Sequence, residues 1–268
     1  MTPGLSFDVV VPTVGRPSLA DLLGALAAGR GPAPERIVLV DDRRQSDQPL
    51  LPDGPPASLD PLHVLPGPAA GPAAARNVGW RAARAPWVAF LDDDVVPDPD
   101  WAERLVADLS ATGSDVAGVQ GRLRVPLPPD RRPTDWERNV AGLEAARWAT
   151  ADMAYRRSAL AAVGGFDERF PRAFREDADL ALRVTAAGWR LAVGTRTATH
   201  PVRPASPWVS VRLQAGNADD ALMRKLHGRH WHRAAGAPRG RIARHVAVTT
   251  AGLAALAATA TGRRRPAA

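Results

Sequence analysis

The sequence predicts an α/β fold in which a mainly parallel, Rossmann-like sheet is flanked by helices. Three short apolar runs, at residues 7–12, 36–40 and 87–91, lack polar alternation, which is typical of strands buried on both faces. Segments with helical periodicity separate these runs and the connections are short, as in right-handed parallel α/β units. Two of the runs end directly in carboxylates. Open sheets of this kind bind ligands at the carboxyl edge of their strands, so we expect a functional site there.

The first half of the chain supplies this alternation in order. The first strand stops at a Pro/Gly loop, residues 12–17, and Ser18 is a plausible N-cap for the helix that follows. The apolar stripe of that helix consists of Leu19, Leu22, Leu23 and Leu26. The elements expected next are a strand at 36–40, a proline-rich loop at 49–61, a strand at 62–65, a helix at 73–84 and a strand at 87–91.

The second half is less regular. Glu176 and Asp177 begin a segment that reads as a helix with acids in its first turn, where the helix dipole favours them. The expected elements are helices at 101–109, 136–148, 158–163 and 176–188, and strands at 116–120, 153–155 and 189–193.

Composition bounds the possible sites. The 268 residues include 45% hydrophobic and 24% charged residues, enough for a substantial core. The chain has no cysteine, so any metal site must use oxygen or imidazole ligands. The first residues lack the basic region and apolar core of a signal peptide, and we expect a cytoplasmic protein.

The positive charge is concentrated at one end. The net charge is +7, but ten basic residues and no acids follow Leu222, and the remainder carries 25 basic and 28 acidic residues. The main domain therefore has a net charge of −3 and no nucleic-acid partner is expected. We place a domain at 1–221 and a basic, Ala-rich helical tail at 222–268. Its apolar part, 246–260, is shorter than the ~20 residues of a spanning helix, so we expect it to lie on the domain or peripherally on an anionic inner membrane face.

The run Asp92-Asp93-Asp94 follows the third buried strand. Three adjacent carboxylates repel one another, and a hard divalent cation at the sheet edge would stabilise them. The alternative is a solvated acidic turn closed by prolines, and the run alone leaves both readings open. Asp41 or Asp42, after the second strand, could accept hydrogen bonds from a nucleobase or ribose. The run does not follow the EF-hand pattern, and no Gly-rich loop precedes a Lys-Ser/Thr pair as a P-loop requires.

Six motifs occur in one order along the chain. They are Val9-Val-Val-Pro-Thr13, Val40-Asp-Asp42, Ala75-Arg-Asn77, Phe90-Leu-Asp-Asp-Asp94, Gly164-Gly-Phe-Asp-Glu168 and Glu176-Asp-Ala-Asp-Leu180. With them the chain resembles the family 2 glycosyltransferases, inverting enzymes with the GT-A fold, over roughly residues 7–205.

The resemblance implies a role for each matching residue. Asp177 would be the general base. A nucleotide-sugar donor would be bound by Pro12, Thr13, Asp42, Arg76, Asp92 and Asp93. Mn²⁺ or Mg²⁺ would be held by Asp92, Asp94 and His200, the last of which some family members place in the metal shell.

The resemblance also implies a reaction: a sugar passes from a nucleotide-diphosphate-sugar donor to an acceptor hydroxyl with inversion, assisted by metal. The acceptor, whether a glycan, a lipid-linked molecule or a small molecule, is not identified by any motif. One alternative is another nucleotide-sugar enzyme such as a nucleotidyltransferase, although residues 12–17 match its Gly-rich basic loop poorly. The other is a non-catalytic GT-A-like binding protein with a membrane-associating tail, against which the clustered Asp92, Asp94 and Asp177 argue.

Overall fold

A computed structural model describes residues 5–45, 47–52, 54–206, 208–238 and 242–262. The chain divides into one compact unit, Met1–Gly236, and a second, Ala237–Ala268. The first unit holds the sheet and the candidate site. The described part of the second unit is the helix α10 (Ile242–Gly262).

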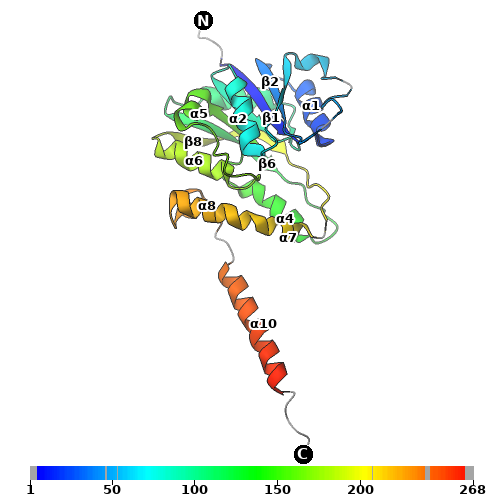
Figure 1. Cartoon of the computed structure of the whole chain (residues 1–268). Helices are drawn as coiled ribbons and strands as arrows, with labels where there is room; N and C mark the ends of the chain where they lie inside the picture. The colour runs from blue at the N-terminus through cyan, green and yellow to red at the C-terminus, as the bar shows by residue number, and fades with distance from the viewer. Residues whose placement is uncertain (1–4, 46, 53, 207, 239–241, 263–268) are drawn as a thin grey trace, which may run out of the picture. The chain divides into compact units, whose positions relative to one another are not determined.

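The described residues form an eight-stranded sheet in the order β3-β2-β1-β4-β7-β6-β8-β5 (Figure 1). Strands β3 (Leu62–Pro66), β2 (Arg36–Asp41), β1 (Phe7–Thr13) and β4 (Trp87–Leu91) are parallel. β7 (Asp152–Arg156) is antiparallel to β4 and to β6 (Val116–Arg124), and β8 (Arg190–Thr199) is parallel to β6. The short β5 (Val96–Pro97) is antiparallel to β8. The expectation of a mainly parallel sheet is confirmed.

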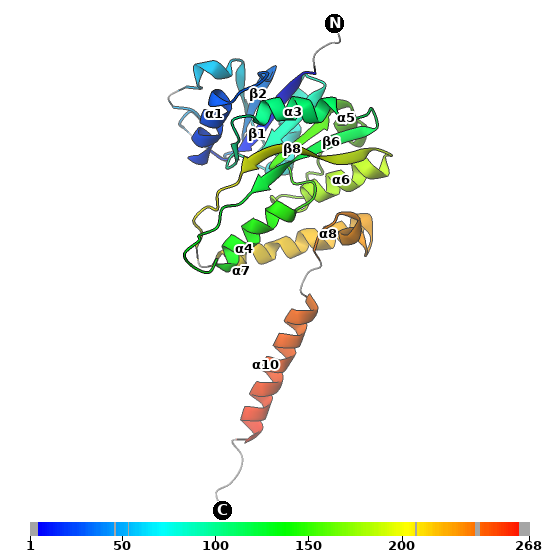
Figure 2. The same cartoon turned by 180° about the vertical axis from the view of Figure 1, so that it is seen from behind.

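Helices cover both faces of the sheet, as the two views show (Figures 1 and 2). On one face, α1 (Ser18–Ala28) and α3 (Trp101–Ser110) pack over a core that includes Leu22 and Leu105. On the other, α2 (Pro72–Ala82), α5 (Arg157–Val163) and α6 (Glu176–Ala186) pack over a core that includes Phe90, Leu160 and Leu180. The strands β1, β2 and β4 are buried almost completely because both faces are covered.

The helix expected at 136–148 is shorter in the structure. α4 (Asp135–Ala141) starts at a capping box formed by Thr134 and Glu137 and gives way to a 3₁₀ turn at Gly142–Ala145. The side chain of Gln120 then donates to Ala146 O at 3.0 Å and accepts from the Trp148 N–H. Trp148 takes a φ of 67°, which a continuing helix excludes. In contrast, β8 runs longer than the expected 189–193, since it pairs with β6 as far as Thr199.

The first unit extends past the predicted boundary at 221. Three helices, α7 (Val209–Leu213), α8 (Asn217–His227) and α9 (Trp231–Ala234), belong to it, and residue 222 lies inside α8. Met223 and Trp231 are buried at 0% and 7% exposure, so this segment packs as part of the domain despite its basic composition.

The part of the predicted tail from Ile242 to Gly262 is helical, as expected. Among the described residues, no helix combines the length and apolar character needed to cross a membrane. The basic residues at 239, 241 and 263–265, on which the predicted membrane contact partly depends, lie outside the described residues.

A further 3₁₀ turn, η1 (Ala57–Leu59), lies in the proline-rich loop before β3.

Candidate functional site

The carboxyl ends of β1, β2, β4 and β8 share one edge of the sheet, because these four strands run in the same direction. Pro12 and Thr13 end β1, Asp42 follows β2, the three aspartates follow β4, and His200 follows β8. The predicted site residues thus come from segments that are far apart in sequence but end at the same edge. Of the remaining two, Arg76 lies in α2 and Asp177 lies in the first turn of α6.

Asp92 and Asp93 point to different partners although they are adjacent. Asp92 Oδ1 accepts from Arg76 Nη2 at 2.7 Å. Asp93 Oδ2 accepts from Thr13 Oγ1 at 2.6 Å and its Oδ1 from Arg16 Nη1 at 2.5 Å. The Asp93 side chain is 1% exposed, so in this structure it holds the end of β1 and has no oxygen open to a donor. Donor contact by Asp93 stays a prediction, and its evident effect is to fix Thr13.

Of the three aspartates, Asp94 has the surroundings most like those of a metal ligand. Its Oδ1 is 3.4 Å from His200 Nε2, and its Oδ2 accepts from Arg203 Nε at 2.8 Å. Burial, followed by the negative charge of Asp92, raises the pKa of Asp94 above its ordinary value. A cation beside this carboxylate is therefore favourable.

The side chains around Asp94 can be compared with the ligands that Mn²⁺ or Mg²⁺ requires. Carboxylate oxygen and imidazole nitrogen suit Mn²⁺, and Asp94 and His200 provide one of each. His200 Nδ1 is buried with no hydrogen-bond partner among the described residues. In the described part of the chain, however, no three His, Asp or Glu side chains are gathered as a ligand set, because Asp92 faces Arg76. The residues fit two positions of a metal shell, and Asp92 as a third ligand stays a prediction.

Arg76 connects the aspartate run to the start of α6. Its side chain is 2% exposed, and Nη1 donates to Glu176 Oε1 at 2.8 Å while Nη2 holds Asp92. Its guanidinium also lies 5.6 Å from the centre of the Phe166 ring. Its Nε is buried without a hydrogen-bond partner among the described residues, and direct contact with a donor, which the resemblance implies, stays a prediction. In the structure Arg76 bridges two carboxylates and so fixes the residue that precedes Asp177.

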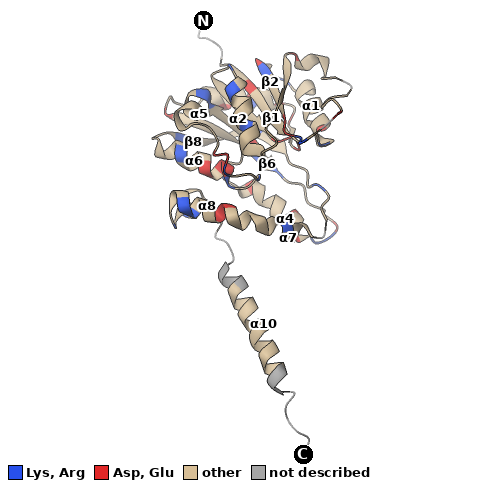
Figure 3. Ribbon diagram, in the orientation of Figure 1, with Lys and Arg blue, Asp and Glu red and all other residues tan. Residues whose placement is uncertain are grey.

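The two acids at the start of α6 have raised pKa values, so their charged forms are disfavoured. Burial raises the pKa of Asp177, an effect that the Ala178 N–H, donating to its Oδ1 at 2.6 Å, opposes. Burial, followed by the charge of Asp177, raises the pKa of Glu176 to about 8, against the opposing effect of Arg76. A carboxylate with a raised pKa is a better proton acceptor, so Asp177 is suited to act as a base. In Figure 3 the ribbon near this end of α6 is coloured red, which marks Asp and Glu residues.

The structure resolves which residue after β2 is open to a ligand. Asp41 is paired with Arg43, whose Nε and Nη2 lie 2.8 and 2.6 Å from its carboxylate oxygens. Asp42 Oδ2 accepts from the Gly71 N–H at 3.0 Å, but its Oδ1 is buried without a partner among the described residues. A Cβ on Gly67 would lie 2.7 Å from that oxygen, so only glycine leaves it room. Of these two aspartates, Asp42 has an acceptor oxygen without a partner among the described residues, and its contact with a nucleoside stays a prediction.

Sequence reasoning gave no role to three side chains that shape the site. Asn77 holds the loop before α6 by donating to Phe166 O at 2.9 Å and accepting from the Phe166 N–H at 2.9 Å. Arg16 and Arg203 neutralise Asp93 and Asp94. The signal for Asn77 was its place beside Arg76 in a motif, whereas the two arginines lie in loops whose partners are distant in sequence.

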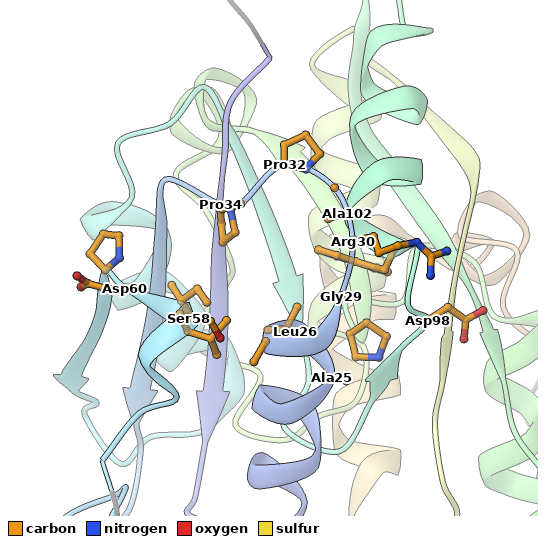
Figure 4. A pocket seen from close by; sticks show the side chains of 18 residues that line it. Ala25, Leu26, Gly29, Arg30, Pro32, Pro34, Ser58, Asp60, Asp98 and Ala102 are labelled. Atoms are coloured by element: carbon orange, nitrogen blue, oxygen red, sulfur yellow. The ribbon is translucent and has the colours of Figure 1, made fainter.

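A cavity lies away from this edge. It has a volume of about 130 Å³ and lies between the end of α1, the start of β2 and the start of α3 (Figure 4). Leu26, Ile37 and Trp101 line it together with several prolines. It is at the amino edge of the sheet, and none of the predicted site residues lines it.

Known proteins resemble this chain in sequence. Residues 8–176 match the model of the family described as glycosyl transferase family 2. The pre-mycofactocin glycosyltransferase of Mycobacterium tuberculosis is 32% identical over 170 residues, which cover 58% of this chain and 35% of that protein. The succinoglycan biosynthesis protein ExoM of Rhizobium meliloti is 30% identical over 242 residues, covering 84% of this chain and 77% of ExoM. The chain thus spans about a third of the mycobacterial relative.

Solved structures show the same fold. Staphylococcus aureus TarS superposes with a TM-score of 0.54 at 19% identity, covering 84% of this chain and 43% of TarS. TarS residues 1–349 in complex with UDP-GlcNAc give a TM-score of 0.55 at 20% identity, covering 76% of this chain and 61% of the other. The predicted GT-A fold is confirmed by this likeness.

Proposed function

Because the chain belongs to glycosyl transferase family 2, we propose that it transfers a sugar from a nucleotide-diphosphate-sugar donor to an acceptor hydroxyl with inversion at the anomeric carbon. The observation that supports this most is the gathering of three different functions at one sheet edge. Asp42 offers a free buried acceptor oxygen, Asp94 and His200 offer metal ligands, and Asp177 offers a base with a raised pKa.

The donor side of the proposal rests on β1, β2 and β4. Thr13, fixed by Asp93, and Asp42, fixed by Gly71, would hold the nucleoside. The TarS complexes contain UDP-GlcNAc and UDP, which makes uridine nucleotides the first donors to test. Mn²⁺ or Mg²⁺ at Asp94 and His200 would supply Lewis-acid stabilisation of the charge that develops on the leaving diphosphate.

The acceptor side rests on α6. Asp177 would take the proton from the acceptor hydroxyl as that oxygen attacks the face of the sugar opposite the leaving group. A single displacement of this kind inverts the configuration and needs no nucleophilic side chain on the protein. Glu176 and Arg76 do not contact substrate in this scheme, and they hold the helix turn that carries Asp177.

A thermal-shift screen tests donor binding first. UDP-, GDP- and dTDP-sugars are added with and without Mn²⁺, and a ligand at about 100 times its Kd should stabilise the native state by about 2.7 kcal/mol. Asp42→Asn should weaken the shift from the nucleotide that binds. Asp135→Asn, an exposed change on α4, should leave it intact. A nucleotide shift that is equal in the Asp42 variant would contradict the assignment of the nucleoside pocket.

Release of nucleoside diphosphate from the selected donor tests catalysis. Asp94→Ala and Asp177→Asn should each abolish it, with circular dichroism spectra like that of the wild type. A wild-type rate of release in either variant would contradict the role assigned to that residue. The configuration of the transferred sugar, read by NMR, decides between inversion and retention. A protein that binds the donor but releases no diphosphate under any condition would instead be the non-catalytic binding protein.

A further inference from the structure

The segment formed by α8 and α9 lies beside the start of α6, as both views show (Figures 1 and 2). Two ion pairs join them. Asp220 Oδ1 accepts from Arg175 Nε at 2.7 Å, and the carboxylate of Asp219 lies 3.0 and 3.1 Å from Arg172 Nη1. Asp219 is 4% exposed, so its pair is shielded from solvent on the carboxylate side. Both arginines come from the stretch that leads directly into α6.

Arg175 is the critical residue of this contact, because it immediately precedes Glu176 and Asp177. It has a φ of 78°, in the left-handed region that costs a residue with a side chain on the order of 1 kcal/mol or more. Its guanidinium lies 4.2 Å from the centre of the Phe174 ring and 4.8 Å from that of Trp231. The strained backbone is therefore held by a side chain fixed between two rings and the Asp220 carboxylate.

A third contact reaches Asp179, two residues further along the helix than the base. His227 Nε2 lies 2.7 Å from Asp179 Oδ1, and Asp179 is completely buried. The other oxygen of Asp179 accepts from Arg183 Nε at 2.8 Å. His227 ends α8, so this helix contacts the first turn of α6 and the loop before it through both of its ends.

The first turn of α6 needs such support from outside. Its N-cap residue makes no side-chain hydrogen bond to the helix, unlike Thr134 at the start of α4. Without a cap, the first N–H groups of a helix have no partner inside it and the turn frays easily. Asp177 is in that turn.

We propose that α8 and α9 are a positioning element for the base, with Asp220, Trp231 and His227 holding the backbone turn that presents Asp177 to the acceptor hydroxyl. This rests on the proposed role of Asp177. None of the three touches substrate. The segment that the composition marks as the beginning of a basic tail would thus be part of the catalytic machinery.

Hydrogen exchange measured on the full chain by mass spectrometry tests the positioning without any donor. In Asp220→Ala and in Trp231→Ala, amides in a peptide spanning 174–182 should exchange roughly tenfold faster, as expected when a local opening loses a strong side-chain contact. A peptide spanning 87–97 should be unchanged. Arg224→Ala, an exposed change on α8 that leaves the contacts with α6 in place, is the matched control. Exchange in 174–182 that stays at the wild-type rate in both variants would overturn the proposal.

A kinetic measurement distinguishes positioning from general stability. With UDP-GlcNAc and Mn²⁺, Asp220→Ala should lower kcat for UDP release at least about tenfold and change the KM for UDP-GlcNAc by less than twofold. Asp220→Glu, which keeps the ion pair, should recover most of kcat. A rise in KM with kcat unchanged would overturn the positioning role. A wild type that releases no UDP would count against the proposed function for this donor, and the exchange experiment would still decide the positioning of the turn.

Discussion

Replacing Arg196 with methionine should lower the free energy of unfolding by about 3–5 kcal/mol, because it leaves buried carboxylates without their cation. Arg196 is 0% exposed and lies in β8. Its Nε donates to Asp152 Oδ1 at 2.8 Å, its Nη2 donates to Val119 O at 2.7 Å, and its Nη1 lies 3.4 Å from Asp108 Oδ2. Trp101 Nε1 donates to the other oxygen of Asp152 at 3.0 Å. The network therefore joins β6, β7, β8 and α3.

Two glycines show how closely the chain is built around these carboxylates. A Cβ on Gly121 would lie 2.0 Å from Asp152 Oδ2, and one on Gly194 would lie 2.0 Å from Asp108 Oδ2. The residues around Arg196 cannot fill the space left by its side chain without moving the backbone at these glycines. Burial already raises the pKa of Asp152, an effect that Arg196 opposes. Without Arg196 the pKa of Asp152 should rise further, so the deficit of the variant should shrink as the pH falls.

Equilibrium unfolding in guanidinium chloride, followed by tryptophan fluorescence, measures the effect. For a domain of this size the loss corresponds to a melting temperature roughly 6–20 °C lower. Arg190→Ala is the control on the same strand: its side chain is 69% exposed and pairs with Asp115 at the surface, so little change is expected. An Arg196 variant as stable as the Arg190 variant would refute the reasoning. Adding Asp108→Asn and Asp152→Asn should recover part of the loss, since the uncompensated charges are then removed.

Three further predictions concern the site and the tail. Glu176 has a pKa raised to about 8, so the folded state favours its neutral form and loses stability as the pH rises from about 4.5 to about 8. The melting temperature of Glu176→Gln relative to the wild type should therefore be higher at pH 8 than at pH 5. An equal difference at both pH values would contradict this prediction. Gly71 has a φ of 103°, and a Cβ there would lie 2.3 Å from Pro171 O. Gly71→Ala should therefore lower the free energy of unfolding, measured by thermal unfolding, by about 1–3 kcal/mol. A neutral result would show that the loop before α6 moves freely. If the basic C-terminal residues contact anionic lipid, sedimentation with anionic vesicles should fall as salt is raised, and binding that is absent or independent of salt would remove this idea.

The parallel half of the sheet was predictable because its strands are buried on both faces, which leaves a continuous apolar run such as Trp87–Leu91. The site edge followed from the carboxylates that end two of these runs. The partners of those carboxylates were not predictable. Arg16 and Arg203 reach Asp93 and Asp94 from loops that lie far away in sequence, and no local pattern encodes such pairs.

The domain boundary shows a different limit of sequence reasoning. Composition changes at residue 222, yet Met223 and Trp231 are buried and α8 crosses that position. A short amphipathic helix can carry its basic residues on the exposed face and still pack on a domain, so charge alone does not mark where folding ends. The helix expected at 136–148 shows another limit, because the side chain of Gln120, from a distant strand, bonds to Ala146 O and to the Trp148 N–H, where the sequence predicts helix.

The three adjacent aspartates serve different ends because the strand end turns each carboxylate toward a different cation. Arg16 holds Asp93 against β1, Arg76 holds Asp92 against α6, and Asp94 faces Arg203 and His200. Asp93 is 1% exposed and Arg76 is 2% exposed, so breaking either of the first two pairs would leave a buried charged group without that partner. Arg203 is 42% exposed and Asp94 also faces the imidazole of His200, so we expect a divalent cation to bind Asp94 in place of Arg203. Substitution at Asp92 or Asp93 should therefore lower stability and activity together, whereas substitution at Asp94 should separate them.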